Sequence, residues 1–445
     1  MNRIFLVAGF WLVASAGSAF ADSPDNVPGL AGTTPGISPE GALAPISIVE
    51  GPGVKVGEGT VLHPIFGLET GFISNVFYEA RGENPVSSGV LRLIAQAGAG
   101  SLSPQRLAID SEGLAPPNHG IFQYRADLRL TYDLMLSTND NVQDQGGLGV
   151  GALFRGAVYP DRPWTFLYLE NFQRVIRSTN FESTSRTNRD INRLQLGLQF
   201  SPGGRALTGL LHYENVIDVF EDVNQRFANR MHNSFGITGS WRFRPVTVFF
   251  ADATFGIFTG IGDSVKVDSY PLAVSVGAQT LLTLNTTLIA RLGYTNGFYS
   301  QGPSYSAPMG GLELGYRYSP MGRATFMYDY VHQDSINANF FRDHYFRILF
   351  EQQFVPFVVT VQPELRLRTY EGVMEIVPSA PTNTREDTII AVAAGARYNL
   401  RDWFATVIEY RLSADLTDFM YAINGDVDQP NYTRHEIVLG VRAAL

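Results

Sequence analysis

Apolar and polar side chains alternate without interruption along Phe122–Leu136, a stretch of about fifteen residues (FQYRADLRLTYDLML). A period of two places successive side chains on opposite faces, so this stretch is predicted to be a β-strand with one apolar and one polar face. Strands of globular proteins usually have about five or six residues, whereas a tilted strand that crosses a bilayer needs about 9–11. The length therefore favours a strand that crosses a membrane.

The same alternation recurs along the chain in about 18 segments, which predicts an all-β fold. The segments lie near residues 62–73, 89–99, 122–136, 147–159, 164–175, 191–200, 206–217, 232–243, 246–256, 271–283, 286–297, 308–318, 323–332, 344–354, 357–369, 388–398, 403–413 and 434–445. One strand-turn-strand unit is repeated, at Leu194–Tyr213 and again at Leu312–Tyr330. Both copies carry Ser-Pro-x-Gly-Arg between the strands, where proline fixes one φ and glycine relieves the next, as a tight turn requires.

The links between the segments alternate in length. Tight turns such as Pro160–Pro163 and Ser201–Arg205 are followed by longer polar links such as 176–190 and 370–387. Short periplasmic turns and longer outer loops are typical of an up-and-down antiparallel barrel in a bacterial outer membrane. The link at about 100–120 should be short and is not. The prediction is therefore a transmembrane β-barrel of about 18 strands, with 16 as the alternative.

The composition agrees with a barrel whose outer surface faces lipid. Only 17% of the residues are charged, against about a quarter in soluble proteins, and 12% are aromatic. After the N-terminal segment, no run approaches 18 uncharged apolar residues, which excludes membrane-spanning helices. A closed barrel is the other structure that satisfies every backbone group within hydrocarbon. Aromatic residues beside the short turns, such as Trp164, Phe200 and Tyr318, are expected to form an interfacial girdle.

Three regions are expected along the chain. Residues 1–21 have a short basic start at Arg3, an apolar core and a small-x-small site ending at Ala21, which predicts a secretory signal peptide. Residues 22–57 are rich in Pro, Gly, Ser and Ala and are expected to form a flexible periplasmic lead-in. Residues 58–445 are expected to form the barrel. The chain has no cysteine, so disulfides are excluded.

The segment His63–Glu79 (HPIFGLETGFISNVFYE), with Ser74-Asn75-Val76 at its centre, and the turn PDRPWTF resemble the β-barrel porin type 2 family of Gram-negative outer-membrane proteins. The resemblance covers about residues 58–445. It implies a place in the cell outer membrane, with outer-membrane lipid as surroundings, and it admits a link to polysaccharide export. The C-terminal strand His435–Leu445 resembles the signal that barrel-assembly machinery reads, although such signals mostly end in an aromatic residue and this one ends in leucine.

Charged residues on the inner face are the candidate pore-lining residues. They are Arg125, Arg129, Arg155, Arg193, Arg291, Arg317, Arg347, Glu351, Glu364, Arg366, Arg368, Glu409 and Arg411. One interpretation is that they form cross-strand ion pairs that stiffen a wet lumen. The other is an arginine ladder that guides anionic solutes or polysaccharide through the pore.

Other classes of function find little support in the sequence. A net charge of −9 argues against a nucleic-acid partner. Neither a nucleophile elbow nor a zinc-protease motif occurs, so we predict no enzyme, no catalytic residue and no cofactor. His212 with Glu214 and His332 with Asp334 have catalytic residue types near strand ends, but they are more often structural. The acidic loops 140–146 and 424–428 lack the length of a calcium loop, so no metal site is predicted.

The predicted function is a porin-like conduit for hydrophilic solutes, because a barrel of about 18 strands encloses an aqueous channel unless it is plugged. One alternative is a dedicated conduit for polysaccharide export that works with periplasmic export proteins. The other is a structural or adhesive barrel whose outer loops carry the function.

Overall fold

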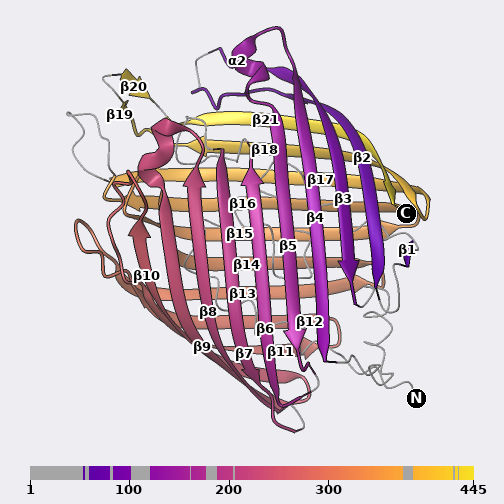
Figure 1. The fold of residues 1–445 in the computed structure, drawn as a ribbon, viewed down its shortest axis with the longest axis vertical. Helices are drawn as coiled ribbons and strands as arrows, with labels where there is room; N and C mark the ends of the chain where they lie inside the picture. The colour runs from indigo at the N-terminus through magenta and orange to yellow at the C-terminus, as the bar shows by residue number, and fades with distance from the viewer. Residues whose placement is uncertain are drawn as a thin grey trace.

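The computed structural model describes residues 54–55, 60–80, 84–101, 121–160, 162–176, 188–203, 206–373, 384–423, 426–428 and 430–444. They form a closed antiparallel barrel of 18 strands (Figure 1). The strands are β2 (Val61–Ile73), β3 (Ser88–Gly100), β4 (Phe122–Leu136), β5 (Gly147–Val158), β6 (Trp164–Val175), β7 (Arg189–Phe200), β8 (Leu207–Phe220), β9 (Arg230–Arg244), β10 (Thr247–Gly260), β11 (Leu272–Thr283), β12 (Thr286–Asn296), β13 (Ser306–Ser319), β14 (Gly322–Asp334), β15 (Phe340–Phe354), β16 (Phe357–Glu371), β17 (Thr384–Arg401), β18 (Phe404–Leu416) and β21 (Tyr432–Ala444).

Each long strand pairs with the next in the chain, and β21 closes the ring by pairing with β2. At this seam Ile65 lies opposite Ala444, and Ile73 lies opposite Glu436. Shorter elements are not among these 18 strands: β1 (Val54–Lys55), β19 (Tyr421–Ile423), β20 (Asp426–Asp428), the helix α2 (Asp140–Gln143) and the 3₁₀ helix η1 (Val223–Ala228). Among the described residues, no helix is long and apolar enough to cross a membrane.

The 18 strands coincide with the 18 alternating segments of the sequence, so the all-β barrel is confirmed and the alternative of 16 strands is wrong. The strands run further than expected at the ends that carry the long links. For example, β8 continues to Phe220, β15 begins at Phe340 and β17 begins at Thr384. The added positions include charged residues, such as Asp218 and Asp387, that are buried in ion pairs. A prediction based on the polarity of residues assigns such charged positions to the loops.

The two faces of each strand differ as the alternation predicts. On β21, Ile437 and Leu439 are 45% and 57% exposed on the outer face, while Glu436 and Arg442 are buried on the inner face. Aromatic residues gather beside the short turns, as in the Trp164–Phe200 pair, whose ring centroids lie 4.4 Å apart. Hydrogen-bonded Tyr–His pairs lie further along the outer face, at Tyr410–His435 and Tyr328–His344. Two girdles of amphipathic rings therefore bound an apolar band.

The repeated Ser-Pro-x-Gly-Arg turn lies at the rim of the barrel. In the second copy, Arg323 forms an ion pair with Glu351 of the neighbouring strand β15, and its side chain is 47% exposed. Arg205 of the first copy lies outside the described residues, as do the predicted signal peptide, most of the lead-in, residues 102–120 and Leu445. Val54–Lys55 of the lead-in form β1, which pairs with Val61 and Leu62 of β2.

Candidate functional site

The inner face of the barrel carries a belt of buried ion pairs, which we call the lumenal belt. Its first part spans β2, β3, β4 and β21, where Arg92 lies among three carboxylates. The Nε atom of Arg92 donates to Asp133 at 2.7 Å, and its terminal nitrogens lie 3.6 Å from Glu69 and 3.4 Å from Glu436. Arg442 joins Glu69 to Glu409 of β18 by a further bond of 2.9 Å. The belt therefore crosses the closing seam.

The second part of the lumenal belt lies on β15 to β18. Arg368 of β16 makes two parallel bonds of 2.7 Å to Asp343 of β15, and both side chains are fully buried. Arg385 of β17 binds Asp387 and reaches Asp415 of β18 at 3.0 Å. Aromatic faces cover the guanidinium groups, with Phe341 at 3.8 Å from Arg368 and Tyr370 at 4.6 Å from Arg385. The two parallel bonds make the Arg368–Asp343 pair stronger and more specific in geometry than a single charge-assisted bond.

Most of the predicted pore-lining residues lie on the inner face, and many have an oppositely charged neighbour. The pairs that the structure brings together are Arg125–Asp127, Arg193–Glu214, Arg291–Asp329, Arg323–Glu351, Glu364–Arg366, Arg368–Asp343 and Glu409–Arg442. These pairs support ion pairing over an uncompensated arginine ladder for those residues.

The other predicted residues have different surroundings. Arg347 contacts the sulfur of Met327 and lies 5.7 Å from the ring of Tyr345. Arg155 lies directly opposite Arg125 in the β4–β5 register, so two arginines face one another there. Arg317 is exposed beside a short turn. Arg129 and Arg411 share the inner face with the lumenal belt.

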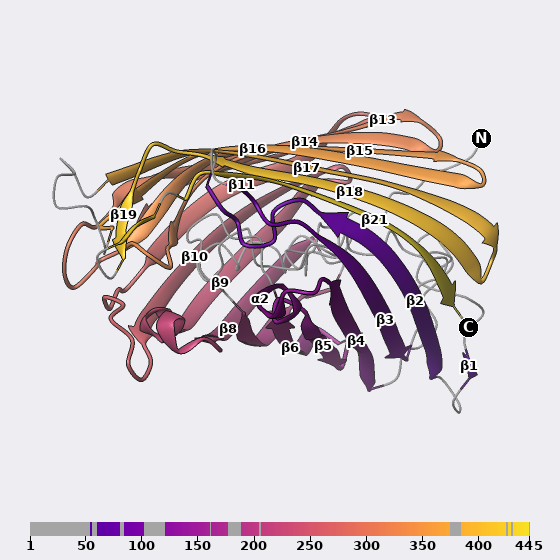
Figure 2. The same ribbon diagram turned by 90° about the horizontal axis from the view of Figure 1, so that it is seen from above.

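The link from β2 to β3 folds into the mouth of the barrel. We call its described residues, 74–80 and 84–87, the inward link; Figure 2 shows the segment after β2 passing inside the ring of strands. The motif Ser74-Asn75-Val76 fixes its start. The backbone N–H of Ser74 donates to His435 at 2.9 Å, and Asn75 exchanges two bonds of 2.9 Å with the backbone of Glu79.

Two apolar contacts hold the inward link against one arc of the wall, on the two sides of the β2–β21 seam. Val76 packs with Val90 of β3, Met135 of β4 and Val142 of α2. Tyr78 reaches Ile389 of β17 and Tyr432 of β21. Residues 374–383 and most of the N-terminal region lie outside the described part of the chain.

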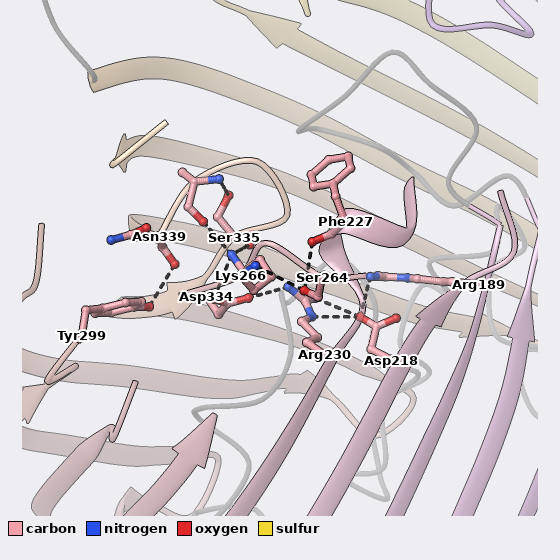
Figure 3. A network of polar contacts seen from close by, with 11 residues as sticks. Arg189, Asp218, Phe227, Arg230, Ser264, Lys266, Tyr299, Asp334, Ser335 and Asn339 are labelled. Carbon is pink, nitrogen blue, oxygen red and sulfur yellow. Dashed lines mark hydrogen bonds and ion pairs between the residues drawn. The ribbon is translucent and has the colours of Figure 1, made fainter. Parts of the chain in front are cut away.

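A second set of contacts joins outer links around Lys266, and we call it the outer hub (Figure 3). The Nζ atom of Lys266, from the β10–β11 link, donates to the carbonyls of Ser335 at 2.5 Å and Ala338 at 2.7 Å. It also lies 3.2 Å from Asp334, which binds Arg230 of β9. One ammonium group therefore ties the β10–β11 link to the β14–β15 link.

Apolar and amide contacts extend the outer hub to other links. Ile336 packs with Phe220 of β8 and Ala228 of η1. Tyr299 donates its hydroxyl to the carbonyl of Asn339 at 2.9 Å, and the Asn339 amide donates to two carbonyls of the β12–β13 link. Strands β8 and β14 are six positions apart around the ring, so these contacts cross the outer end of the barrel rather than follow its wall.

Sequence reasoning missed the lysine of the outer hub and the role of Asp334. Asp334 was considered only with His332, but His332 stacks on Tyr305 with ring centroids 4.7 Å apart. His212 and Glu214 occupy successive inner positions on β8. In the described part of the chain, no group of three or more His, Asp or Glu residues is placed to hold a metal ion. In the first acidic loop, Asp140–Gln143 form the helix α2, which Asn139 caps. In the second acidic loop, residues 424–425 lie outside the described residues.

Comparisons with known proteins find likeness in solved structures alone. No family model matches the chain, and no curated protein matches it. The chain is similar to OccK2 (OpdF) of Pseudomonas aeruginosa, solved in complex with glucuronate, at 12% identity and a TM-score of 0.45, over 86% of this chain and 98% of that one. It is similar to the FrpB iron transporter of Neisseria meningitidis at 10% identity and a TM-score of 0.43, over 86% and 82% of the two chains.

A further match is the outer membrane protein OpdK of Pseudomonas aeruginosa, at 11% identity and a TM-score of 0.40, over 86% of this chain and 99% of that one. At such identities and scores these likenesses carry no argument about the solute. Membership of the β-barrel porin type 2 family stays a prediction, and what the chain does has to be argued from the barrel and its lumen.

Proposed function

We propose that this chain is an outer-membrane barrel that acts as a porin-like conduit for small hydrophilic solutes. The observation that carries the proposal is the division of its faces, with apolar side chains such as Leu439 outside and charged side chains such as Arg92 inside one closed ring. Charged side chains on the inner surface favour a lumen that contains water and dissolved solutes over a lumen filled by apolar side chains. The two aromatic girdles support a bilayer as the surroundings.

The lumenal belt bears on which solutes pass. Its arginines are balanced by carboxylates, as in the Arg368–Asp343 and Arg442–Glu409 pairs. A neutralised wall exerts a weaker field on a passing ion than a ladder of unpaired arginines would. We therefore expect weak discrimination between neutral and charged solutes of equal size. Strong anion selectivity would instead favour the ladder interpretation.

Liposome swelling tests the proposal. Vesicles that contain the refolded full-length protein are diluted into isotonic solutions of neutral sugars of increasing size and of a sugar acid. The proposal expects fast swelling with the smallest solutes and a size limit for larger ones, with similar rates for neutral and acidic solutes of one size. A folded protein that admits no solute would contradict it. Such a result would favour a partner-dependent polysaccharide conduit or a structural barrel.

A further inference from the structure

The inward link lies directly over a charged part of the lumenal belt. Arg434 of β21 is 6% exposed, and its guanidinium carbon lies 4.5 Å from the centre of the Tyr78 ring. The same ring meets Tyr432 edge to face, with centroids 4.9 Å apart. A cation over an aromatic face is attracted by the ring quadrupole, so Tyr78 both covers Arg434 and is held by it.

The backbone of the inward link is fixed at several points, so Tyr78 is held in place. Asn75 is 2% exposed, makes two bonds to Glu79 across one tight turn and donates a third to the carbonyl of Thr433. Ala80 forms an antiparallel bridge with Tyr432, and the N–H of Val76 donates to Val86 at 2.8 Å. Tyr78 itself has φ of 59°, a conformation that costs energy for any residue except glycine. Such strain persists only where the surrounding structure enforces it.

The link also reduces the room inside the barrel. Val90, Met135 and Ile389 are inner-face residues of three different strands, and all are buried beneath side chains of the link or α2. The inward link therefore takes up lumen space in front of one arc of the wall, formed by the consecutive strands β17, β18, β21, β2, β3 and β4.

We propose that the inward link is the constriction of the conduit and that Tyr78 sets its ion preference by covering Arg434. This inference rests on the proposed function, because a constriction matters only to a barrel that conducts. Removal of the ring widens the path and exposes the guanidinium group of Arg434 to passing ions. Its carboxylate neighbour Glu436, 3.5 Å away, is shared with Arg92, so it offsets the charge of Arg434 only in part. The conductance and the preference for anions should then rise together.

Single-channel recording in planar bilayers tests this inference. The first variant is Tyr78→Gly, because glycine accepts the positive φ and removes the ring. We expect a higher conductance than in the unmodified chain, and a rise of up to about fivefold in the ratio of anion to cation permeability. That is roughly the Boltzmann factor for a unit charge about 4 Å away in water. The double variant Tyr78→Gly with Arg434→Gln should keep the higher conductance and lose the change in selectivity.

Three further variants make the outcome decisive. Tyr78→Phe keeps the ring and should behave as the unmodified chain, as should Tyr316→Ala, which removes a lipid-facing ring that is 50% exposed. Asn75→Ala removes the side-chain bonds of the turn and leaves the Tyr78 side chain in place, and it should also raise the conductance. This variant replaces Tyr78→Gly if Tyr78→Gly does not fold. Unchanged conductance and selectivity in folded Tyr78→Gly or Asn75→Ala would overturn the inference while the conduit stands. No openings from the unmodified chain would instead refute the proposed function.

Discussion

Buried arginines stabilise the inner wall only while their carboxylate partners are present. Both Arg368 and Asp343 have fully buried side chains, so neither can exchange its partner for water. When one member of such a pair is removed, the other is left as an uncompensated buried charge, which costs about 3–5 kcal/mol. An exposed pair such as Arg323–Glu351 is worth about 0–1 kcal/mol, because water screens it.

Substitution of Arg368 tests this contrast. We expect Arg368→Met to lower the free energy of unfolding by about 3–5 kcal/mol, measured by guanidinium titration of the barrel in lipid vesicles. The matched rim variant Arg323→Gln should change it by less than about 1 kcal/mol. The double variant Arg368→Met with Asp343→Leu should recover part of the loss, since no unpaired charge remains. A double variant less stable than Arg368→Met would contradict this account of the belt.

Single residues also show where sequence reasoning reached its limit. The alternation of side chains along a strand predicts that Arg366, Arg368 and Glu409 point to the inner face, so their orientation could be predicted. Their partners could not, since Asp343 is 25 residues from Arg368 and Arg442 is 33 residues from Glu409. Register between neighbouring strands is decided by the packing of whole faces and turns rather than by any one residue.

At the scale of the element, the seam between β2 and β21 depends on a close backbone approach at Gly71. A Cβ atom added there would lie 2.2 Å from the carbonyl oxygen of Ile437, which the ladder holds in place. We expect Gly71→Ala to destabilise barrel closure by about 1–3 kcal/mol through overpacking, seen as a lower temperature of the shift between folded and unfolded bands in an electrophoresis gel.

The control for the seam is Gly209→Ala on β8. A Cβ atom at Gly209 would meet no atom within 4 Å, so this variant should keep the mobility shift of the unmodified chain. Equal behaviour of the two alanine variants would show that the seam is not packed as closely as the Gly71 contact requires.

Lys266 makes the contacts that join two links in the outer hub. We expect Lys266→Met to leave two carbonyls without their donor, at a cost of about 1–3 kcal/mol, and to open the links locally. Hydrogen exchange followed by mass spectrometry should show faster exchange in segments containing Val265 and Asn339, whose N–H groups bond to Phe227 and Glu371. The exposed pair member Arg342, 3.7 Å from Glu371, provides the control Arg342→Gln. Unchanged exchange in Lys266→Met would contradict the role of the lysine.

Two tyrosines of the β12–β13 link, Tyr299 and Tyr305, make the free energy of unfolding depend on pH. Burial raises the pKa of Tyr299 well above its ordinary value of 10.0, and the nearby charge of Asp334 adds to this. Burial also raises the pKa of Tyr305. Below the ordinary pKa both phenols are neutral in the folded and unfolded states, so they add no pH dependence. Above it the unfolded chain ionises first, and the free energy of unfolding should fall as the pH rises.

Tyrosinate absorbance checks this alkaline behaviour. The folded chain and the folded variant Tyr299→Phe should give the same absorbance through the ordinary range of tyrosine ionisation, because Tyr299 stays neutral in the fold. After unfolding, the variant should lack one ionising tyrosine. A folded-state difference of one tyrosine near the ordinary pKa would show that Tyr299 is accessible to water.

The strands could be predicted and the inward-folded links could not, for a physical reason. Strand positions depend on local alternation, which is why all 18 segments were found. The inward link and the outer hub depend on contacts between distant parts, such as Lys266 with Ser335 or Tyr78 with Tyr432. The motif Ser74-Asn75-Val76 did mark the start of the inward link, but its hydrogen bonds to His435 and Thr433 appear only when the ring is closed.

At the scale of the whole molecule, a closed ring accounts for the composition of the chain. An outer band that faces lipid, as we propose, needs few charges, which agrees with the 17% charged residues of the chain. Charged residues of the strands such as Arg92 and Glu436 are buried on the inner face. The lumenal belt holds the wall, the inward link narrows one side of the mouth, and the outer hub joins links on another side. If the barrel conducts as we propose, its outer end is narrower than its wall of 18 strands would allow.

Conductance across a planar bilayer tests the central claim most directly. The full-length protein is first shown to be folded by its electrophoretic shift, and is then added to a bilayer in symmetric salt. We expect steady, stepwise openings whose conductance rises with salt concentration and is smaller than that of Tyr78→Gly. A folded barrel that inserts into the bilayer and passes no current would contradict it.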